Sequence, residues 1–210
     1  MIIAIDGPAA AGKGTMARRM AKHFNLVYLD TGLLYRAVGK KVLDQGGRPE
    51  DPDFATSVAE ALVVDDLQDG GLRTEDVGQA ASKISAVPGV RAALLQFQRD
   101  FAATPPKGKN GAVLDGRDIG SVVCPDAPVK LFVTASAEVR AERRLKELLG
   151  RGSEAIYARV LEDMKERDAR DSSRATAPLE PAEDAKLLDT SDLDAEQAFA
   201  EALEFINSRI

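Results

Sequence analysis

The chain has 210 residues, a length typical of one globular domain with a small insertion, and 44% of its residues are hydrophobic, which suffices for a full core. The formal net charge of −6 argues against general binding to nucleic acid or membrane surfaces, so an anionic substrate would need arginines concentrated at one place. The single cysteine, Cys124, excludes an intrachain disulfide. No apolar run approaches the roughly 18–20 residues that span a membrane, and the chain does not begin with a signal-peptide pattern. We therefore expect a cytoplasmic protein.

The chain opens with an apolar segment followed directly by a glycine-rich loop. Met1–Asp6 predicts a buried strand, and the loop fits G-x-x-x-x-G-K-x-T, one residue longer before the threonine than the plain phosphate-loop motif. Glycines let consecutive backbone N–H groups turn toward a polyphosphate, and a helix that begins near Lys13 would point its positive end at the same place. The residues expected to bind a nucleotide here are Gly7, Pro8, Ala9, Ala10, Ala11, Gly12, Lys13, Gly14 and Thr15.

Two side chains of this loop carry chemistry. Lys13, which we expect to be exposed, supplies a positive charge to the outer phosphates, and the hydroxyl of Thr15 can hold Mg²⁺. The alternative is a turn rich in glycine and alanine that binds nothing. The buried-type strand before the loop and the helical pattern after it favour the phosphate site.

Later segments predict alternating strands and helices. Strands are expected at Leu26–Leu29, Ala112–Asp115, Val129–Val133 and Lys186–Asp189, the last three of them buried. Apolar residues at helical spacing predict one helix that begins near Pro88 and runs to Phe101, and a C-terminal helix from Ala195 to Ile206 that is capped by Asp194 and Gln197. Strands that alternate with helices indicate a parallel sheet covered on both faces.

The stretch 45–87 interrupts this alternation. It contains two Gly-Gly pairs and two prolines but no convincing buried strand, which predicts an inserted, mobile helical subdomain. Further along, Thr104–Asn110 is predicted to be a surface loop.

Arginines follow the predicted strands, where an α/β sheet binds its ligands. Arg36 lies on the helix after the second strand, and Arg117 follows the third. Arg167, Arg170 and Arg174 share one face if their segment is helical. Arginines that converge on a phosphate loop are what phosphoryl transfer needs, because negative charge must be neutralised on the donor, the acceptor and the moving group.

Arg140, Arg143 and Arg144 have similar spacing, and for Arg140 and Arg144 a solvated helix face is an equally good interpretation. No residue in the sequence stands out as a general base or a nucleophile. His23 is predicted to pack or to end a helix, and Cys124 to be a small core residue. A phosphate acceptor is already an anion and needs no base, so the pattern favours transfer from one nucleotide to another.

With these residues identified, the chain resembles the bacterial cytidylate (CMP) kinases almost from end to end. The phosphate loop alone is common to many functions, whereas the last two of the following segments are much more specific. The segments are Ile5–Thr15, Leu29–Arg36, Ala81–Arg91, Leu114–Gly120 and Lys165–Arg174.

The resemblance implies an α/β fold of the P-loop NTPase type, with a five-stranded parallel sheet flanked by helices. The core would comprise 1–44 and 88–210, with a short lid at about 146–159 and a nucleoside monophosphate-binding insertion at 45–87. The family's insertion usually includes a small antiparallel sheet, and here the stretch 63–72 is too short for it by about one hairpin.

The resemblance also implies a reaction: transfer of the γ-phosphoryl group of ATP to CMP or dCMP, with Mg²⁺, by a monomer that binds neither nucleic acid nor membranes. Catalytic roles fall to Lys13, Arg117 and Arg167. ATP is bound by the loop, Arg140 and Arg144. The residues implied for CMP are Thr31, Arg36, Ser82, Arg91, Arg117, Asp118, Arg167, Asp171 and Arg174, of which Ser82, Arg91 and Asp118 would read the cytosine.

Two other functions compete with this one. A P-loop kinase for another small acceptor, such as UMP, AMP or shikimate, would use the same loop, and a panel of acceptors separates these. A regulatory GTPase-type switch is disfavoured, because such proteins usually carry Asn-Lys-x-Asp and no asparagine here is followed by lysine.

Overall fold

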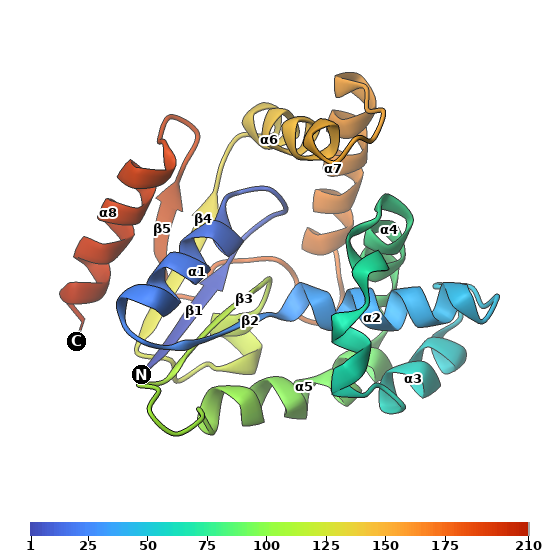
Figure 1. Cartoon of the computed structure of the whole chain (residues 1–210), viewed down its shortest axis with the longest axis horizontal. Coiled ribbons are helices and arrows are strands. Elements are labelled where there is room, and N and C mark those ends of the chain that lie inside the picture. Colours follow the sequence, from blue (N-terminus) through green and yellow to red (C-terminus); the bar gives the residue numbers. More distant parts are fainter. Residues whose placement is uncertain (210) are drawn as a thin grey trace.

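All five strands run in the same direction and form one sheet in the order β2-β3-β1-β4-β5 (Figure 1). The computed structural model describes residues 1–209. Within them the strands are β1 (Ile2–Asp6), β2 (Val27–Asp30), β3 (Ala112–Gly116), β4 (Val129–Thr134) and β5 (Lys186–Asp189). The central position of β1 places the loop that follows it at the middle of the sheet's carboxyl edge, where parallel sheets bind ligands.

Helices lie between the strands in sequence and on both sides of the sheet in space (Figure 1). They are α1 (Lys13–His23), α2 (Thr31–Asp44), α3 (Pro52–Glu60), α4 (Glu75–Ile84), α5 (Pro88–Ala103), α6 (Ala137–Gly150), α7 (Tyr157–Ser172) and α8 (Ala195–Asn207). Shorter turns are the 3₁₀ helices η1 (Val64–Gln68) and η2 (Gly70–Arg73) and the π-helical turn η3 (Ile119–Val123).

The hydrophobic core has a layer on each face of the sheet. On one face Ile3, Ile5 and Leu131 pack with Met20 of α1 and Ile206 of α8. On the other face a second cluster joins Ala4, Leu114, Ile119, Val123 and Phe97. The predicted α/β class with a five-stranded parallel sheet is therefore confirmed.

Two details differ from the sequence predictions. The segment Lys186–Asp189 is a strand, but not a buried one: only Leu188 is buried, and Leu187 is 56% exposed. It lies at the edge of the sheet, where one side of a strand meets solvent. Helix α7 ends at Ser172, so Arg174 lies beyond the helix that carries Arg167 and Arg170.

The ends of the predicted helices agree well with the structure. Pro88 occupies the first position of α5, and Asp194 with Gln197 forms the reciprocal cap of α8. His23 ends α1 with its ring 4.7 Å from that of Phe24, and Cys124 is buried. Cys124 is thus a small core residue as predicted, and His23, which is exposed, ends a helix as predicted.

The stretch 45–87 is helical in this structure, since it holds α3, η1, η2 and α4, and no strand is assigned within it. Its apolar residues pack in a third cluster with α2 and α5, in which Leu34, Val38, Ile84, Val90 and Leu94 are buried. This group of helices stands beside the sheet on the right of Figure 1.

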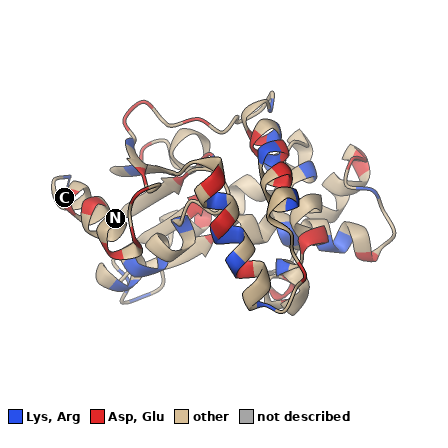
Figure 2. Cartoon of the chain, turned by 90° about the horizontal axis from the view of Figure 1, so that it is seen from above, with Lys and Arg blue, Asp and Glu red and all other residues tan. Residues whose placement is uncertain are grey.

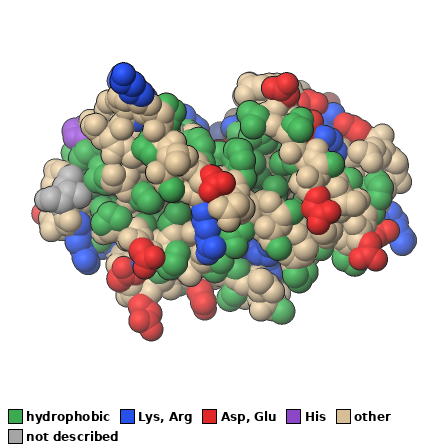
Figure 3. Space-filling model, turned by 90° about the horizontal axis from the view of Figure 1, so that it is seen from below, with side chains coloured by type: hydrophobic (Ala, Val, Ile, Leu, Met, Phe, Trp, Pro, Cys, Tyr) green, Lys and Arg blue, Asp and Glu red, His purple; other side chains and the backbone are tan. Residues whose placement is uncertain are grey.

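Charged residues of both signs are interspersed along the helices seen from above, without a wholly basic face in that view (Figure 2). From below, charged side chains of both signs are spread among apolar and polar ones, and the surface is hollowed between two lobes (Figure 3). No helix in residues 1–209 is both long and apolar enough to cross a membrane.

Candidate active site

The loop after β1 has the backbone of a phosphate-binding loop. Gly7 has φ of 139° and Gly12 has φ of 95°, conformations that side-chain-bearing residues rarely adopt. A Cβ at Gly7 would lie 1.9 Å from the carbonyl oxygen of Val133, so glycine is also required for space. Gly12 is the residue before α1 and supplies no side-chain cap, which leaves the first N–H groups of the helix free for an anion.

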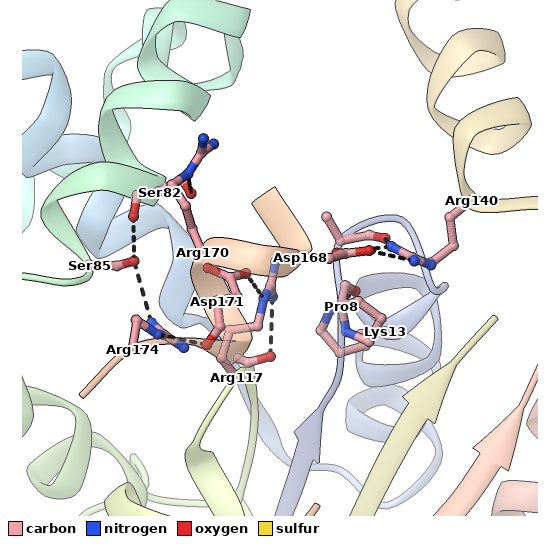
Figure 4. Close-up of polar contacts among 12 residues, drawn as sticks. Pro8, Lys13, Ser82, Ser85, Arg117, Arg140, Asp168, Arg170, Asp171 and Arg174 are labelled. Carbon is pink, nitrogen blue, oxygen red and sulfur yellow. Dashed lines mark hydrogen bonds and ion pairs between the residues drawn. The ribbon is translucent and has the colours of Figure 1, made fainter. Parts of the chain in front are cut away.

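Lys13 is buried rather than exposed as predicted, with only 7% of its surface accessible. Its Nζ donates a hydrogen bond to the carbonyl oxygen of Pro8 at 2.7 Å, so the amine curls back over the loop (Figure 4). Burial, followed by repulsion from Arg117, lowers the pKa of Lys13 to about 7. The amine is therefore poised to gain a proton when a polyphosphate adds negative charge beside it.

Two buried carboxylates flank the loop. Asp6 accepts hydrogen bonds from the N–H groups of Ile119 and Gly120 at 2.8 and 2.7 Å, which ties the end of β1 to the start of η3. Asp115, at the end of β3, accepts a hydrogen bond from the hydroxyl of Tyr28 at 2.9 Å. Burial raises the pKa of each carboxyl group to about 6.

A cleft of about 1270 Å³ lies in front of this loop. Its wall brings together the loop from Ala9 to Thr15 and every residue predicted for CMP. These residues are Thr31, Arg36, Ser82, Arg91, Arg117, Asp118, Arg167, Asp171 and Arg174. Of the residues predicted for ATP, Arg144 also lines the cleft.

Three arginines and one carboxylate stand at the centre of the cleft. Arg117 donates from Nε to Oδ2 of Asp171 at 2.9 Å, and Arg174 donates from Nε to the carbonyl oxygen of Asp171 at 3.2 Å (Figure 4). Burial, followed by repulsion from Arg117, lowers the pKa of Arg167 to about 10. Within residues 1–209, Nε of Arg167 and Nη2 of Arg174 are buried without an acceptor. A site with buried cationic donors of this kind fits an anion.

At the far end of the cleft, two residues predicted to read the base contact each other. Arg91 forms an ion pair through Nη2 with Asp118, and its Nη1 donates to the carbonyl oxygen of Ser85 at 3.2 Å. Asp118 is buried, and this burial raises its pKa despite the nearby arginines. Ser85 in turn donates from Oγ to the carbonyl oxygen of Ser82 at 2.8 Å, so α4 and the start of α5 form one wall.

The other two predicted CMP residues anchor the cleft to its surroundings. Thr31 is buried and donates from Oγ1 to the carbonyl oxygen of Asp115 at 2.7 Å. Arg36 donates from Nη1 to the carbonyl oxygen of Leu72 at 2.9 Å, and burial lowers its pKa.

The two arginines of α6 that were predicted for ATP differ in their surroundings. Arg140 does not line the cleft: it donates to the carbonyl oxygen of Ala135 at 2.8 Å and forms a two-pronged pair with Asp168 at 3.1 and 2.6 Å. Arg144 pairs with Glu75 of α4 at 2.8 Å. The stretch 146–159 comprises the end of α6, a connecting loop and the start of α7.

Several residues of the site were not assigned from the sequence. Asp168 fixes Arg140, Ser85 links Arg91 and Arg174 to α4, and Arg170 of α7 donates to Ser82 of α4. Arg170 and Asp168 belong to the same motif as Arg167, and that motif could have identified them as site residues. No sequence pattern identifies Ser85, because a single serine near a helix end is common in any sequence.

Comparison with known proteins gives consistent matches. The model of the cytidylate kinase family matches residues 3–208. The cytidylate kinase of Paramagnetospirillum magneticum is 65% identical over 208 residues, covering 99% of this chain and 98% of that protein. That of Methylocella silvestris is 58% identical, covering 99% of this chain and 94% of that protein. An uncharacterized protein from Eubacterium ventriosum has a similar fold, with a TM-score of 0.57 at 17% identity over 100% of this chain and 99% of that one.

Proposed function

The chain belongs to the cytidylate kinase family, and from this premise we propose that its cleft transfers the γ-phosphoryl group of ATP to CMP or dCMP, giving ADP and CDP or dCDP. The observation that supports the assignment of the site is a pair of buried guanidinium groups in the wall of the cleft. Arg167 and Arg174 each keep a buried N–H without an acceptor in residues 1–209, and both line the cleft. A nucleotide phosphate supplies the missing acceptors.

We propose that CMP lies with its phosphate among Arg36, Arg117 and Arg174. Its ribose hydroxyls then lie near Arg167 and Asp171. The cytosine faces Ser82, Arg91 and Asp118: a carboxylate and a hydroxyl can accept from the exocyclic amine, and a guanidinium can donate to O2 and N3 of the ring.

In the reaction, an oxygen of the CMP phosphate forms a bond to the γ-phosphorus of ATP, and the bond from that phosphorus to the β,γ-bridging oxygen breaks. ADP leaves with the electron pair of the broken bond. The acceptor oxygen is already ionised, so no side chain has to remove a proton. The work of the protein is alignment and charge neutralisation, which we assign to Lys13, Arg117 and Arg167.

ATP is the phosphate donor that the family implies. We propose that the loop from Gly7 to Thr15 and Arg144 bind its phosphates, and that Arg140 acts on the same site through the loop, because its Nη1 lies 3.4 Å from the carbonyl oxygen of Ala9. The exposed hydroxyl of Thr15, in the first turn of α1, is a hard oxygen donor that fits Mg²⁺. Bound there with the phosphates, Mg²⁺ would neutralise part of their charge.

We further propose a core of 1–44 and 88–210, a shortened insertion of 45–87 that binds CMP, and a lid at about 146–159. The enzyme would act in the cytoplasm as a monomer on free nucleotides.

A panel of acceptors tests this function: CMP, dCMP, UMP, AMP and shikimate, each with ATP and Mg²⁺. CMP and dCMP should be the best substrates. The variant Arg174→Ala should raise KM for CMP and leave KM for ATP almost unchanged, whereas Arg48→Ala, an exposed arginine outside the cleft, should change neither. Equal activity with all nucleotides, or an unchanged KM in Arg174→Ala, would reject the proposed acceptor site.

A further inference from the structure

Arg170 joins α7 to α4, two neighbouring helices that both contribute residues to the wall of the cleft. It extends from α7, which carries Arg167 and Asp171, toward α4, which carries Ser82 (Figure 4). Its Nε donates to Oγ of Ser82 at 3.2 Å, and its Nη2 donates to Oε1 of Gln79 at 2.9 Å. The two contacts lie one helical turn apart on the same face of α4.

Ser82 depends on this contact more than a surface serine would. Only 3% of its surface is exposed, so water has little access to it. Within residues 1–209, Arg170 supplies the one hydrogen bond found for Oγ of Ser82. A serine hydroxyl has two lone pairs, so a donor on one of them leaves the other for a ligand.

The planar guanidinium suits this place because Nε and Nη2 point in fixed, nearly parallel directions. One group can therefore hold two side chains of α4 at once. Its side chain is 34% exposed, and its Nη1 lies 3.7 Å from Oε2 of Glu166, one turn earlier on α7. The arginine is thus supported from its own helix while it contacts α4.

We propose that Arg170 is a positioning residue for base selection, which holds Ser82 where it meets the pyrimidine amine. This inference rests on the proposed function, in which Ser82 is part of the cytosine site. Arg170 makes the position of α4 depend on α7, so that binding of the correct base and alignment of Arg167 and Asp171 are linked. Without it, Oγ of Ser82 loses this hydrogen bond, while the contacts of α4 with Arg144 and Arg174 remain.

The test is the ratio of kcat/KM for CMP to that for UMP. Arg170→Ala should lower this ratio by roughly five- to tenfold, the loss expected for one net hydrogen bond, chiefly through a higher KM for CMP. KM for ATP should stay the same. Arg170→Lys, which keeps the charge but not the paired donors, should restore the ratio only in part. Thermal unfolding shows whether each variant is folded, and a purely structural role would lower stability without changing the ratio.

A control and a double variant sharpen the result. Glu75→Gln breaks a different side-chain contact to α4, the ion pair with Arg144, and should leave the ratio unchanged because Glu75 does not contact Ser82. Arg170→Ala combined with Ser82→Ala should discriminate no worse than Ser82→Ala alone. The inference is wrong if Ser82→Ala changes the ratio but a folded Arg170→Ala does not. It is also wrong if the effects of the two substitutions on the ratio add in the double variant. In both cases the assignment of the cytosine site remains valid. If Ser82→Ala itself has no effect, the assignment of Ser82 in the proposed function fails, and the inference fails with it.

Discussion

Oδ2 of Asp171 lies 2.9 Å from Nε of Arg117, and this ion pair joins α7 to the end of β3 in the middle of the cleft. The carboxylate is almost fully buried, with 4% of its side chain exposed, and the arginine side chain is 18% exposed. The pair therefore holds in place an arginine that we assign to phosphoryl transfer.

Asp171→Asn should destabilise the protein by about 1–3 kcal/mol at neutral pH, because the buried Arg117 loses its charged acceptor. The nearby arginines lower the pKa of Asp171 in the folded state, although burial acts against them. The carboxylate therefore contributes stability above its ordinary pKa of 3.8, and this contribution is lost as the pH falls through the lower folded value.

Urea unfolding at pH 7 and near pH 3 measures this difference. The gap between the wild type and Asp171→Asn should be large at pH 7 and smaller near pH 3. Glu196→Gln, which breaks the exposed pair with Arg19, is the matched control and should cost less than about 1 kcal/mol. Equal losses in the two variants would show that the Arg117–Asp171 pair does not stabilise the fold.

Asp118→Ala should weaken the use of CMP more than that of UMP. UMP carries a carbonyl oxygen where CMP carries an amine, so the carboxylate accepts from one and repels the other. An unpaired amine costs about 1–3 kcal/mol, roughly ten- to a hundredfold in kcat/KM. The variant also releases Arg91, which then can donate to the uracil carbonyl. Equal losses of kcat/KM for CMP and UMP would mean that Asp118 does not read the base.

Much of the fold could be predicted from local pattern. The apolar run at β1, the glycines of the loop, Pro88 and the cap of Asp194 each specify structure over a few residues, and all four are as predicted. The arginines after β2 and β3 were predictable for a related reason, since parallel strands bring the residues at their carboxyl ends to one edge.

The contacts among these residues could not be predicted, because they depend on how helices distant in sequence pack. Lys13 is buried by the surrounding loop and arginines, and the residues next to it in the sequence do not indicate this burial. Arg140 pairs with Asp168, which lies 28 residues further along the chain, although the spacing of Arg140 and its neighbouring arginines is also typical of an exposed helix face. The exposure of β5 likewise follows from its place at the sheet edge, a consequence of strand order.

Ile84→Ala tests whether the stretch 45–87 unfolds with the rest of the chain. Ile84 is fully buried in the cluster that joins α3 and α4 to α2 and α5, and the truncation should cost about 2–5 kcal/mol. We expect one unfolding transition shifted to lower urea concentration, as for Leu131→Ala in the sheet core. A separate early transition in Ile84→Ala alone would show that this cluster is an independent folding unit.

ATP binding should take up a proton above neutral pH, and Lys13 is the residue responsible. Its pKa of about 7 means that the amine is protonated below pH 6 and mostly neutral by pH 8 in the free enzyme. Negative phosphates favour the protonated form of Lys13 and raise its pKa when ATP binds.

The affinity for ATP should therefore fall as the pH rises above 7, by up to about tenfold per pH unit until the pKa of Lys13 in the complex is reached. Calorimetry at pH 8 in buffers of different ionisation enthalpy counts the protons taken up. Lys13→Arg, which stays protonated, should bind ATP with less proton uptake and a flatter pH dependence, whereas Lys22→Met, altered at the exposed end of α1, should behave like the wild type. Unchanged proton uptake in Lys13→Arg would assign the titration to another group.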